Sequence, residues 1–212
     1  MHREDKRDFD IVADTWDEEP RRVKLAEEVT AAIRREVPLT RVMEALDYGC
    51  GSGLVTLGVR PFVRHITGAD SSRGMLDVLE KKVREQGLHN VTTWLIDLEN
   101  QGPLTGSYDL IISSMTLHHV HDVKELLAKF VRLLNPMGWL ALADLEAEDG
   151  SFHDNPAGVH HHGFDKVYLR DEFIANGLND VSLVTAATVD KPSHGGIRHS
   201  YPVILAVGRK PA

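Results

Sequence analysis

The chain is poor in cysteine and has no long apolar run. Cys50 is the single cysteine among 212 residues, so no disulfide can form within the chain, as is usual in a reducing compartment. No apolar stretch approaches the roughly 20 residues that span a bilayer. The first ten residues, MHREDKRDFD, are too charged for a secretory signal. We therefore expect a cytoplasmic protein without a membrane segment.

Basic charge is also scarce. The chain has 24 Lys and Arg residues against 32 Asp and Glu residues, which gives a formal net charge of -8. Binding along a phosphate backbone needs a basic surface, so nucleic acid is not an expected partner. Arg21, Arg22 and Lys24 form a small basic cluster, but acidic residues surround it, which is typical of a solvated helix face. The length suits one domain, residues 1–212.

What the chain does contain is an alternation of helix-like and strand-like segments. Residues 9–19 and 21–36 carry apolar side chains at helical spacing, and Pro20 suits the first turn of the second helix. After Pro38, we expect strands at residues 41–49, 63–70, 90–97, 108–114, 138–145, 181–189 and 201–210, and helices at residues 75–87, 122–134 and 169–177. Repeated strand–helix–strand units with a terminal hairpin predict an α/β fold, an open and mostly parallel sheet with helices on both faces.

Three glycines alternate directly after the first expected strand, in ALDYGCGSGL at residues 45–54. Gly49, Gly51 and Gly53 permit positive φ angles and let a ligand approach the backbone closely. The nicotinamide fingerprint G-x-G-x-x-G would need a small residue at position 54, where Leu54 stands. Ligands bind at the carboxyl ends of the strands in such sheets, so this turn predicts a binding loop of a different type.

An acidic residue ends each of the next two expected strands. Asp70 follows the glycine turn by about 20 residues, where an acid can accept both hydroxyls of a ribose. Asp97 ends the third strand, where it could accept from the exocyclic amine of an adenine. Either acid alone is explained by a helix cap or a turn. Three such features at three successive strand ends predict a nucleoside pocket.

These motifs, taken in order, resemble those of a known enzyme family. LDYGCGSG, GADSSRGML, LIDLEN, YDLIISSMTLHHVHD and LLNPMGWLALAD resemble class I S-adenosylmethionine-dependent methyltransferases, especially the small-molecule group related to ubiquinone and menaquinone C-methyltransferases. The opening FDIVADTWD resembles their lid, F-D-x-x-A-x-x-Y-D, with Trp16 in the tyrosine place. The resemblance implies a Rossmann-like, mostly parallel sheet of seven strands with the last antiparallel, residues 1–37 as an N-terminal helical lid, and S-adenosyl-L-methionine as the cofactor.

The resemblance also implies a role for each motif residue. The glycine loop would surround the methionine part of the cofactor, Asp70 would hold the ribose, Asp97 would border the adenine, and Ser113 would offer its carbonyl to the adenine amino group. Cys50 fits the loop and is not expected to act as a nucleophile. The implied cofactor-binding residues are Trp16, Asp47, Gly49, Cys50, Gly51, Gly53, Asp70, Ser71, Asp97, Leu98 and Ser113.

Histidines gather on the side where the family places the methyl acceptor. After the fourth strand, LHHVHD contains a pair, His118 and His119, of which one commonly packs within the family's fold and the other faces the acceptor. Residues 146–166 form the implied acceptor-side loop, which contains His153 and a triplet at residues 160–162. Loops of this length are usually functional lids or disordered segments.

Three interpretations of the loop histidines remain open. His153, one or two of the triplet and an aspartate could bind a divalent metal, although no HExxH or CxxC spacing is present. One histidine could be a general base, or the rings could be polar packing. We assign no metal ligand and expect His119, His160 and His162 to be catalytic.

The predicted function is methyl transfer by in-line displacement to a small-molecule acceptor, in which the cofactor supplies the electrophile and the protein supplies position. Two alternatives keep the cofactor: methylation of a protein or RNA, and a catalytically inactive S-adenosylmethionine-binding partner subunit. A nicotinamide oxidoreductase is disfavoured by Leu54.

Overall fold

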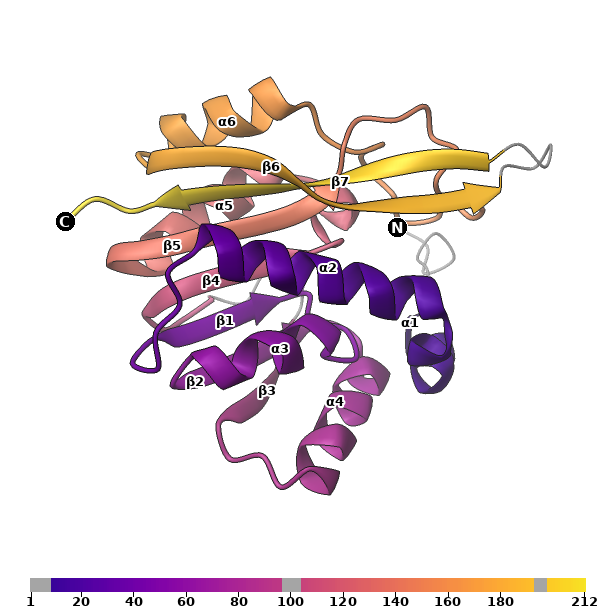
Figure 1. Cartoon of the computed structure of the whole chain (residues 1–212), viewed down its shortest axis with the longest axis horizontal. Helices are drawn as coiled ribbons and strands as arrows, with labels where there is room; N and C mark the ends of the chain where they lie inside the picture. Colours follow the sequence, from indigo (N-terminus) through magenta and orange to yellow (C-terminus); the bar gives the residue numbers. More distant parts are fainter. Residues whose placement is uncertain (1–8, 97–103, 193–197) are drawn as a thin grey trace.

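A seven-stranded sheet runs through the computed structural model, which describes residues 9–96, 104–192 and 198–212 (Figure 1). The strand order is β3-β2-β1-β4-β5-β7-β6, and β7 runs antiparallel to both of its neighbours. The strands are β1 (Glu44–Tyr48), β2 (His65–Asp70), β3 (Val91–Leu95), β4 (Tyr108–Ser114), β5 (Leu134–Leu145), β6 (Asn179–Pro192) and β7 (Arg198–Arg209). The predicted fold class, including the antiparallel last strand, is confirmed.

Helices cover both faces of the sheet, with α2 and α3 in front of it and α5 behind it in Figure 1. The α-helices are α1 (Phe9–Val12), α2 (Pro20–Glu36), α3 (Leu54–Val59), α4 (Arg73–Glu85), α5 (Val123–Leu133) and α6 (Lys166–Ala175). Short 3-10 helices are η2 (Ala13–Glu18), η3 (Arg60–Phe62) and η4 (Leu117–His119). The predicted helical start of the chain is confirmed, as a short α-helix followed by a 3-10 turn rather than one continuous helix.

Strand β4 shows why the core has two layers. Leu110 and Ile112 point into the core on the side of α2 and α3, whereas Ile111 points into the core on the side of α5 and α6. All three side chains are fully buried. Successive residues of a strand face opposite sides, so a strand covered on both faces is apolar at every position. This is the pattern that predicted β4 from DLII.

The helices begin at polar caps that the sequence supplies. Ser72 caps α4 by accepting from the Met75 amide, and Asp122 caps α5 by accepting from the Glu125 amide. Asp165 accepts from two amides at the start of α6. Capping side chains satisfy amides that have no partner within the helix. Each cap also fixes where the loop before the helix ends, and so where its functional residues lie.

Sequence reasoning missed α3, which follows the glycine loop at once. Its residues, LVTLGV, include two β-branched valines and Gly58, a composition that favours no helix. The helix forms because it packs against α2: a Cβ at Gly58 would lie 2.8 Å from Thr30 Oγ1. The fifth strand also begins at Leu134 rather than at residue 138, because Asn135 and Pro136 extend it irregularly toward β4.

The strand order creates a switch point between β1 and β4. The chain proceeds outward from β1 to β2 and β3 on one side, and from β4 to β5 on the other. In open α/β sheets, ligands bind outside the carboxyl ends of the strands at such a switch point, so the turns after β1 and β4 are where a ligand site is expected. Among the helices of the described ranges, none combines the length and apolarity that a bilayer crossing requires.

Candidate active site

The glycine loop after β1 adopts a conformation that other residues rarely reach. Gly49, Gly51 and Gly53 have φ angles of 72°, 52° and 84°. A Cβ at Gly49 would lie 2.3 Å from Thr116 Oγ1, and one at Gly53 would lie 2.3 Å from Leu79 Cδ1. At Gly51 the nearest atom would be Met75 Sδ at 4.0 Å. The outer two glycines therefore pack the loop tightly, and Gly51 presents its backbone to open space.

Asp70 ties the end of β2 to this loop. Its Oδ2 accepts a hydrogen bond of 2.7 Å from the Gly51 amide, and its Oδ1 accepts one of 2.9 Å from the Ser72 amide. Burial raises the pKa of Asp70, although hydrogen bonds from the backbone of Ser72, Gly51 and Ser71 oppose that rise. A carboxylate has about four acceptor positions, so Asp70 keeps acceptor capacity for a ligand hydroxyl beside the glycine loop.

Asp47 and Cys50 lie beneath the loop. Asp47 is 1% exposed, and its Oδ2 accepts a hydrogen bond of 2.6 Å from Thr56 Oγ1 in α3. Burial raises the pKa of Asp47 to about 7. Burial likewise raises the pKa of the Cys50 thiol, which keeps it protonated and a poor nucleophile. Both buried side chains pack at the glycine loop, and the predicted cofactor-binding roles of Asp47 and Cys50 stay predictions.

Ser113 and Thr116 hold the two sides of the switch point together. Ser113 Oγ donates to the Tyr48 carbonyl over 2.8 Å, which joins the end of β4 to the end of β1. Thr116 Oγ1 donates to the Gly49 carbonyl over 3.3 Å. The turn that follows β4 is therefore held against the glycine loop. Asp97 and Leu98, the expected adenine residues, lie outside the described residues.

Two aspartates fasten the N-terminal segment over the glycine loop. Asp10 Oδ1 accepts from Ser72 Oγ over 2.5 Å and from the Gly74 amide over 2.7 Å. Asp17 accepts from Ser52 Oγ over 2.6 Å and forms an ion pair with Lys82. These hydrogen bonds lower the pKa of Asp10. The segment thus binds both the loop and the start of α4.

Aromatic side chains extend this cover toward the histidines. The Phe9 ring lies edge-on to Trp16, at 5.8 Å between centroids, and edge-on to His119, at 5.5 Å. The Arg22 guanidinium lies 3.7 Å above the Trp16 ring. The cover therefore reaches from the glycine loop to η4, with Trp16 near its middle. The role of Trp16 in cofactor binding stays a prediction.

His118 and Asp144 form a buried pair at the ends of β4 and β5. His118 Nδ1 and Asp144 Oδ1 lie 2.7 Å apart, and the side chains are 2% and 1% exposed. Burial alone would raise the pKa of Asp144, but attraction to His118 and hydrogen bonds from His118 and Leu145 outweigh it and hold the pKa below its usual value. An ionised carboxylate only accepts, so Nδ1 carries a hydrogen.

His119 and His153 flank this pair. The His118 and His119 ring centroids are 4.2 Å apart, and His153 lies 4.8 Å from His118 and 5.8 Å from His119. His119 Nδ1 donates to the Gly158 carbonyl over 2.7 Å. The structure thus brings His119, a predicted catalytic residue, together with one histidine expected in the fold and one from the acceptor-side loop.

The His160–His162 triplet attaches the acceptor-side loop to η4 mainly through its backbone. The amides of His160 and His161 donate to the His118 carbonyl, and His161 Nε2 donates to the Val120 carbonyl over 3.0 Å. The His160 ring is exposed and lies 5.4 Å from that of His121. The side chain of His162 is 55% exposed. The structure does not bring His160 and His162 to the His118 group, and their catalytic role stays a prediction.

A family model described as a methyltransferase domain matches residues 19–183 of the chain. This range includes the glycine loop, Asp70, Asp144 and the whole histidine group.

The chain belongs to this methyltransferase family.

Individual relatives agree with that membership. An uncharacterized methyltransferase of Schizosaccharomyces pombe is 32% identical over 163 residues, which are 70% of this chain and 56% of the relative. The YcgJ protein of Bacillus subtilis superposes with a TM-score of 0.71 at 19% identity, over 87% of this chain and 98% of that chain. The chain spans about half or less of the length of the curated relatives that it matches first.

A second similar solved structure contains a bound cofactor. Phosphoethanolamine N-methyltransferase 2 of Haemonchus contortus, in complex with S-adenosyl-L-methionine, superposes with a TM-score of 0.69 at 15% identity, over 96% of this chain and 60% of that chain. Family and fold together confirm the class I methyltransferase resemblance that the ordered motifs predicted.

Several contacts of this candidate site could not be found from motifs. Asp10 and Asp17 are the first and last aspartates of the lid motif FDIVADTWD, but their serine partners lie 62 and 35 residues away in the sequence. Asp144, at the end of the motif LLNPMGWLALAD, meets His118 from the neighbouring strand β5, and nothing in the motif indicates that partner. A polar residue at the carboxyl end of a buried strand indicates a functional position, and this pattern predicts Asp144 as well as Asp70.

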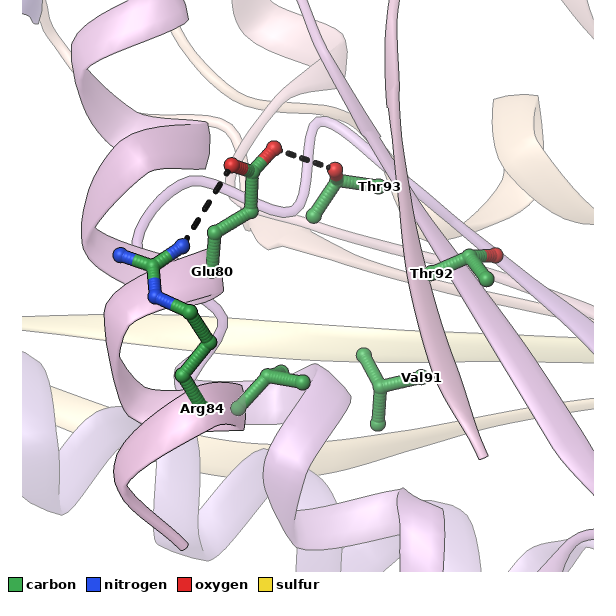
Figure 2. A pocket seen from close by; sticks show the side chains of 6 residues that line it. Glu80, Arg84, Val91, Thr92 and Thr93 are labelled. Atoms are coloured by element: carbon green, nitrogen blue, oxygen red, sulfur yellow. Dashed lines mark hydrogen bonds and ion pairs between the residues drawn. The ribbon is translucent and has the colours of Figure 1, made fainter. Parts of the chain in front are cut away.

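A surface hollow on the methyltransferase domain lies elsewhere. It has a volume of about 360 Å³ between α4 and β3, and Figure 2 shows Glu80 bridging Thr93 and Arg84 at its wall. It is lined by Glu80, Val83, Arg84, Val91, Thr92 and Thr93. None of these residues belongs to the glycine loop or the histidine group, so the hollow is separate from the candidate active site.

Proposed function

We propose that the chain binds S-adenosyl-L-methionine across the ends of β1, β2 and β4 and transfers its methyl group to a small-molecule acceptor held beside η4. The observation that carries the proposal is the hydrogen bond between Asp70 and the Gly51 amide at the switch point. It joins the acid expected for a ribose to the backbone expected for the methionine part, in a chain of the methyltransferase family.

The residues present fit this cofactor. Gly51 leaves open space where a side chain would stand, so a ligand can approach the loop backbone. Asp70 keeps acceptor capacity for the ribose while its backbone donors hold it in place. A charged acceptor that is largely buried makes stronger hydrogen bonds than one in water. The cofactor, when bound, supplies the electrophilic methyl group on its sulfonium.

The chain's own contribution is position and the exclusion of water. The N-terminal segment, fastened by Asp10 and Asp17, covers the cofactor side. The acceptor-side loop, attached through the triplet backbone, covers the other side. Holding two reactants in line can supply about 7–11 kcal/mol of the barrier reduction. Two covers over one crevice favour an acceptor small enough to be enclosed, and the acidic net charge disfavours nucleic acid.

His119 is the residue that we assign to acceptor activation. η4 begins directly after Thr116, which donates to the glycine loop, so His119 lies next to the proposed cofactor. The Gly158 carbonyl can only accept, so Nδ1 of His119 carries a hydrogen and the lone pair of the neutral ring lies on Nε2. Nε2 is the atom we assign to the acceptor side. His160 and His162 stay sequence-based candidates for the same step.

The test is the affinity for S-adenosylhomocysteine, the demethylated cofactor, measured by titration calorimetry on Asp70→Asn. We expect binding more than tenfold weaker than in the unchanged protein, because the ribose loses a charged acceptor. Asp171→Asn, an exposed acid of α6, is the matched control and should bind normally. Thermal unfolding of both variants checks the fold. Equal affinity in a folded Asp70→Asn protein would refute the pocket assignment.

A further inference from the structure

Three imidazoles converge at the carboxyl edge of the sheet. His118 and His119 come from η4, and His153 comes from the loop after β5. Each offers one ligand atom, and these three atoms all lie within 4.8 Å of one another. Three neutral imidazoles are a common donor set for zinc and related transition metals, and a poor one for magnesium or calcium, which prefer oxygen.

The first ring is held in the form that a metal requires. His118 donates its Nδ1 hydrogen to the buried Asp144 carboxylate, so the lone pair of the neutral ring is on Nε2. Metal-binding histidines nearly always donate their second ring hydrogen to a carboxylate or a carbonyl, which fixes the ring and makes it a better ligand. His118 and Asp144 have this arrangement in the interior of the fold.

The second ring, that of His119, donates its Nδ1 hydrogen in the same way but to a different acceptor. His119 Nδ1 donates to the Gly158 carbonyl of the acceptor-side loop over 2.7 Å. A carbonyl oxygen serves the same purpose as a carboxylate behind a metal-binding histidine. Two neighbouring histidines therefore have the same tautomer, fixed by two unrelated segments of the chain. Packing of the two rings against each other would not require both of them to carry the hydrogen on Nδ1.

The third ring is placed by the segment around it. Glu148 Oε2 accepts from the amides of Gly150 and Phe152, which closes a tight turn just before His153. The Phe152 carbonyl accepts from Lys191, and the Phe152 ring lies edge-on to Tyr201 at 5.2 Å. His153 thus follows a residue that is tied to both β6 and β7. A fixed backbone with a partly buried ring lets a small side-chain rotation bring the nitrogen to a metal.

We propose that His118, His119 and His153 bind one divalent transition metal ion of the zinc type, with Asp144 and the Gly158 carbonyl as supporting acceptors. Nitrogens around a tetrahedral zinc ion stand about 3.3 Å apart, given Zn–N distances near 2.05 Å. The widest separation in the group, at most 4.8 Å, therefore needs to close by no more than about 1.5 Å. Three protein ligands leave one position open, as in catalytic zinc sites.

This site differs from the metal interpretation drawn from the sequence. That interpretation combined His153 with the 160–162 triplet, whose rings at positions 160 and 162 are exposed and lie apart from the group. The proposed site contains the pair after β4 instead. Its ligands are neutral, so the ion keeps a positive charge that the carboxylate behind His118 offsets only in part, and an anionic fourth ligand is favoured.

The open position indicates the acceptor class, and this step rests on the proposed methyl transfer. With the ion bound, Nε2 of His119 acts on the acceptor through the ion and does not accept the acceptor's proton directly. A thiol or an acidic hydroxyl would bind there as its anion, because a metal ion lowers the pKa of a bound group, and the proton leaves to solvent. The anion's lone pair forms the new bond to the methyl carbon. The carbon–sulfur bond of the sulfonium breaks, and its electron pair stays on the sulfur, which becomes a neutral thioether.

The test uses the full chain without a histidine tag, treated with a chelator and then titrated with Co²⁺, whose visible absorption reports tetrahedral nitrogen ligation. We expect one Co²⁺ per chain, displaced by Zn²⁺. His153→Ala and His119→Ala should each weaken binding at least tenfold. His89→Ala, an exposed histidine before β3, and the His160→Ala/His162→Ala double variant should bind as the unchanged chain does.

Two outcomes overturn the inference: no saturable Co²⁺ binding by the unchanged chain, or unchanged binding in both folded single variants. Loss of binding only in the double variant is a case of the second outcome, and it would place the metal at the triplet. Two ligand variants are used so that one can be read if the other fails to fold, as judged by thermal unfolding. S-adenosylhomocysteine titration of the same metal-free samples keeps the two proposals apart, since its failure would count against the proposed function alone.

Discussion

Asp17 Oδ1 accepts a hydrogen bond of 2.6 Å from Ser52 Oγ, so the N-terminal segment is fastened directly to the glycine loop. The same carboxylate forms an ion pair with Lys82 of α4, and both side chains are less than one third exposed. The segment, the loop and α4 thus meet at one charged group. If the segment covers the bound cofactor, this contact controls how tightly it closes.

We expect Asp17→Asn to weaken S-adenosylhomocysteine binding about fivefold to thirtyfold, the equivalent of about 1–2 kcal/mol for a charged hydrogen bond. Hydrogen exchange at residues 9–18 should become faster, while overall thermal stability changes little. Asp14→Asn, an exposed acid of the same 3-10 helix, is the control. Exchange and affinity that match the control would show that the contact does not hold the segment closed.

Asp47 gives the fold a predictable pH dependence. Burial raises its pKa to about 7, while an unfolded chain has the usual value near 3.8. Between these values the folded state holds a proton that the unfolded state releases. Stability therefore falls as pH rises from about 4 to 7, by at most about 1.4 kcal/mol per pH unit, and levels off above pH 7.

Urea unfolding of Asp47→Asn at pH 4.5 and pH 7 measures this effect. Asparagine cannot ionise but can still accept from Thr56, so the variant should lose less stability over this range than the unchanged chain. The difference between the two proteins should be greatest at neutral pH. Parallel pH profiles would show that Asp47 is ionised in the folded protein, and that its burial does not have the assigned effect.

His119 should affect turnover rather than cofactor binding. We expect His119→Ala to lower the turnover number by about 10²- to 10⁴-fold, the usual contribution of one acid–base or activating group. S-adenosylhomocysteine affinity should stay within about twofold, because the proposed cofactor contacts lie on the glycine loop and Asp70. Release of S-adenosylhomocysteine with a panel of thiols and phenols is the readout, and His89→Ala is the control. Parallel losses of affinity and turnover would move His119 to the cofactor side.

The sequence-based assignment of His160 and His162 has its own test. Single alanine variants lower turnover if their side chains act in catalysis. The His160 amide can still donate to the His118 carbonyl and the His162 carbonyl can still accept from the Glu148 amide after the substitutions, so any loss is a side-chain effect. Full activity in both variants would limit the triplet's role to attaching the loop.

Asp144 should support the proposed metal site without touching the metal. Asp144→Asn should lower Co²⁺ affinity about tenfold to 100-fold, the usual cost of losing a supporting acceptor. The variant keeps an oxygen for the His118 hydrogen bond but loses the charge. Co²⁺ titration together with thermal unfolding separates the metal effect from a loss of fold. Unchanged affinity would show that the carboxylate does not act on the metal through His118.

Local sequence was enough to predict the parts of the site that each strand carries by itself. The apolar run of β4, the alternating glycines after β1 and the acid after β2 each indicate their own environment, and the sheet order then brings them together. Gly51 and Asp70 are joined because β1 and β2 are parallel neighbours whose carboxyl ends meet. The proposed cofactor side therefore follows from the motifs and the fold class.

The acceptor side could not be predicted in the same way, because its contacts depend on the register of the sheet and on loop conformation. His118 meets Asp144 because β4 and β5 align Ser114 with Ala143. His153 reaches the His118–Asp144 pair through a turn that Glu148 closes with hydrogen bonds to backbone amides. Such a turn produces no periodic pattern in the sequence. The triplet predicted functional side chains at positions 160 and 162, whereas the structure shows backbone amides of the triplet bound to η4.

Titration of the unchanged chain with S-adenosylhomocysteine by calorimetry, with NAD as the comparison ligand, is the most direct measurement of what this fold binds. We expect saturable binding of one S-adenosylhomocysteine per chain and no heat from NAD, because the loop departs from the nicotinamide fingerprint at Leu54. Binding of NAD, or no binding of S-adenosylhomocysteine by the folded chain, would contradict the assignment of the pocket formed by Asp70 and the glycine loop.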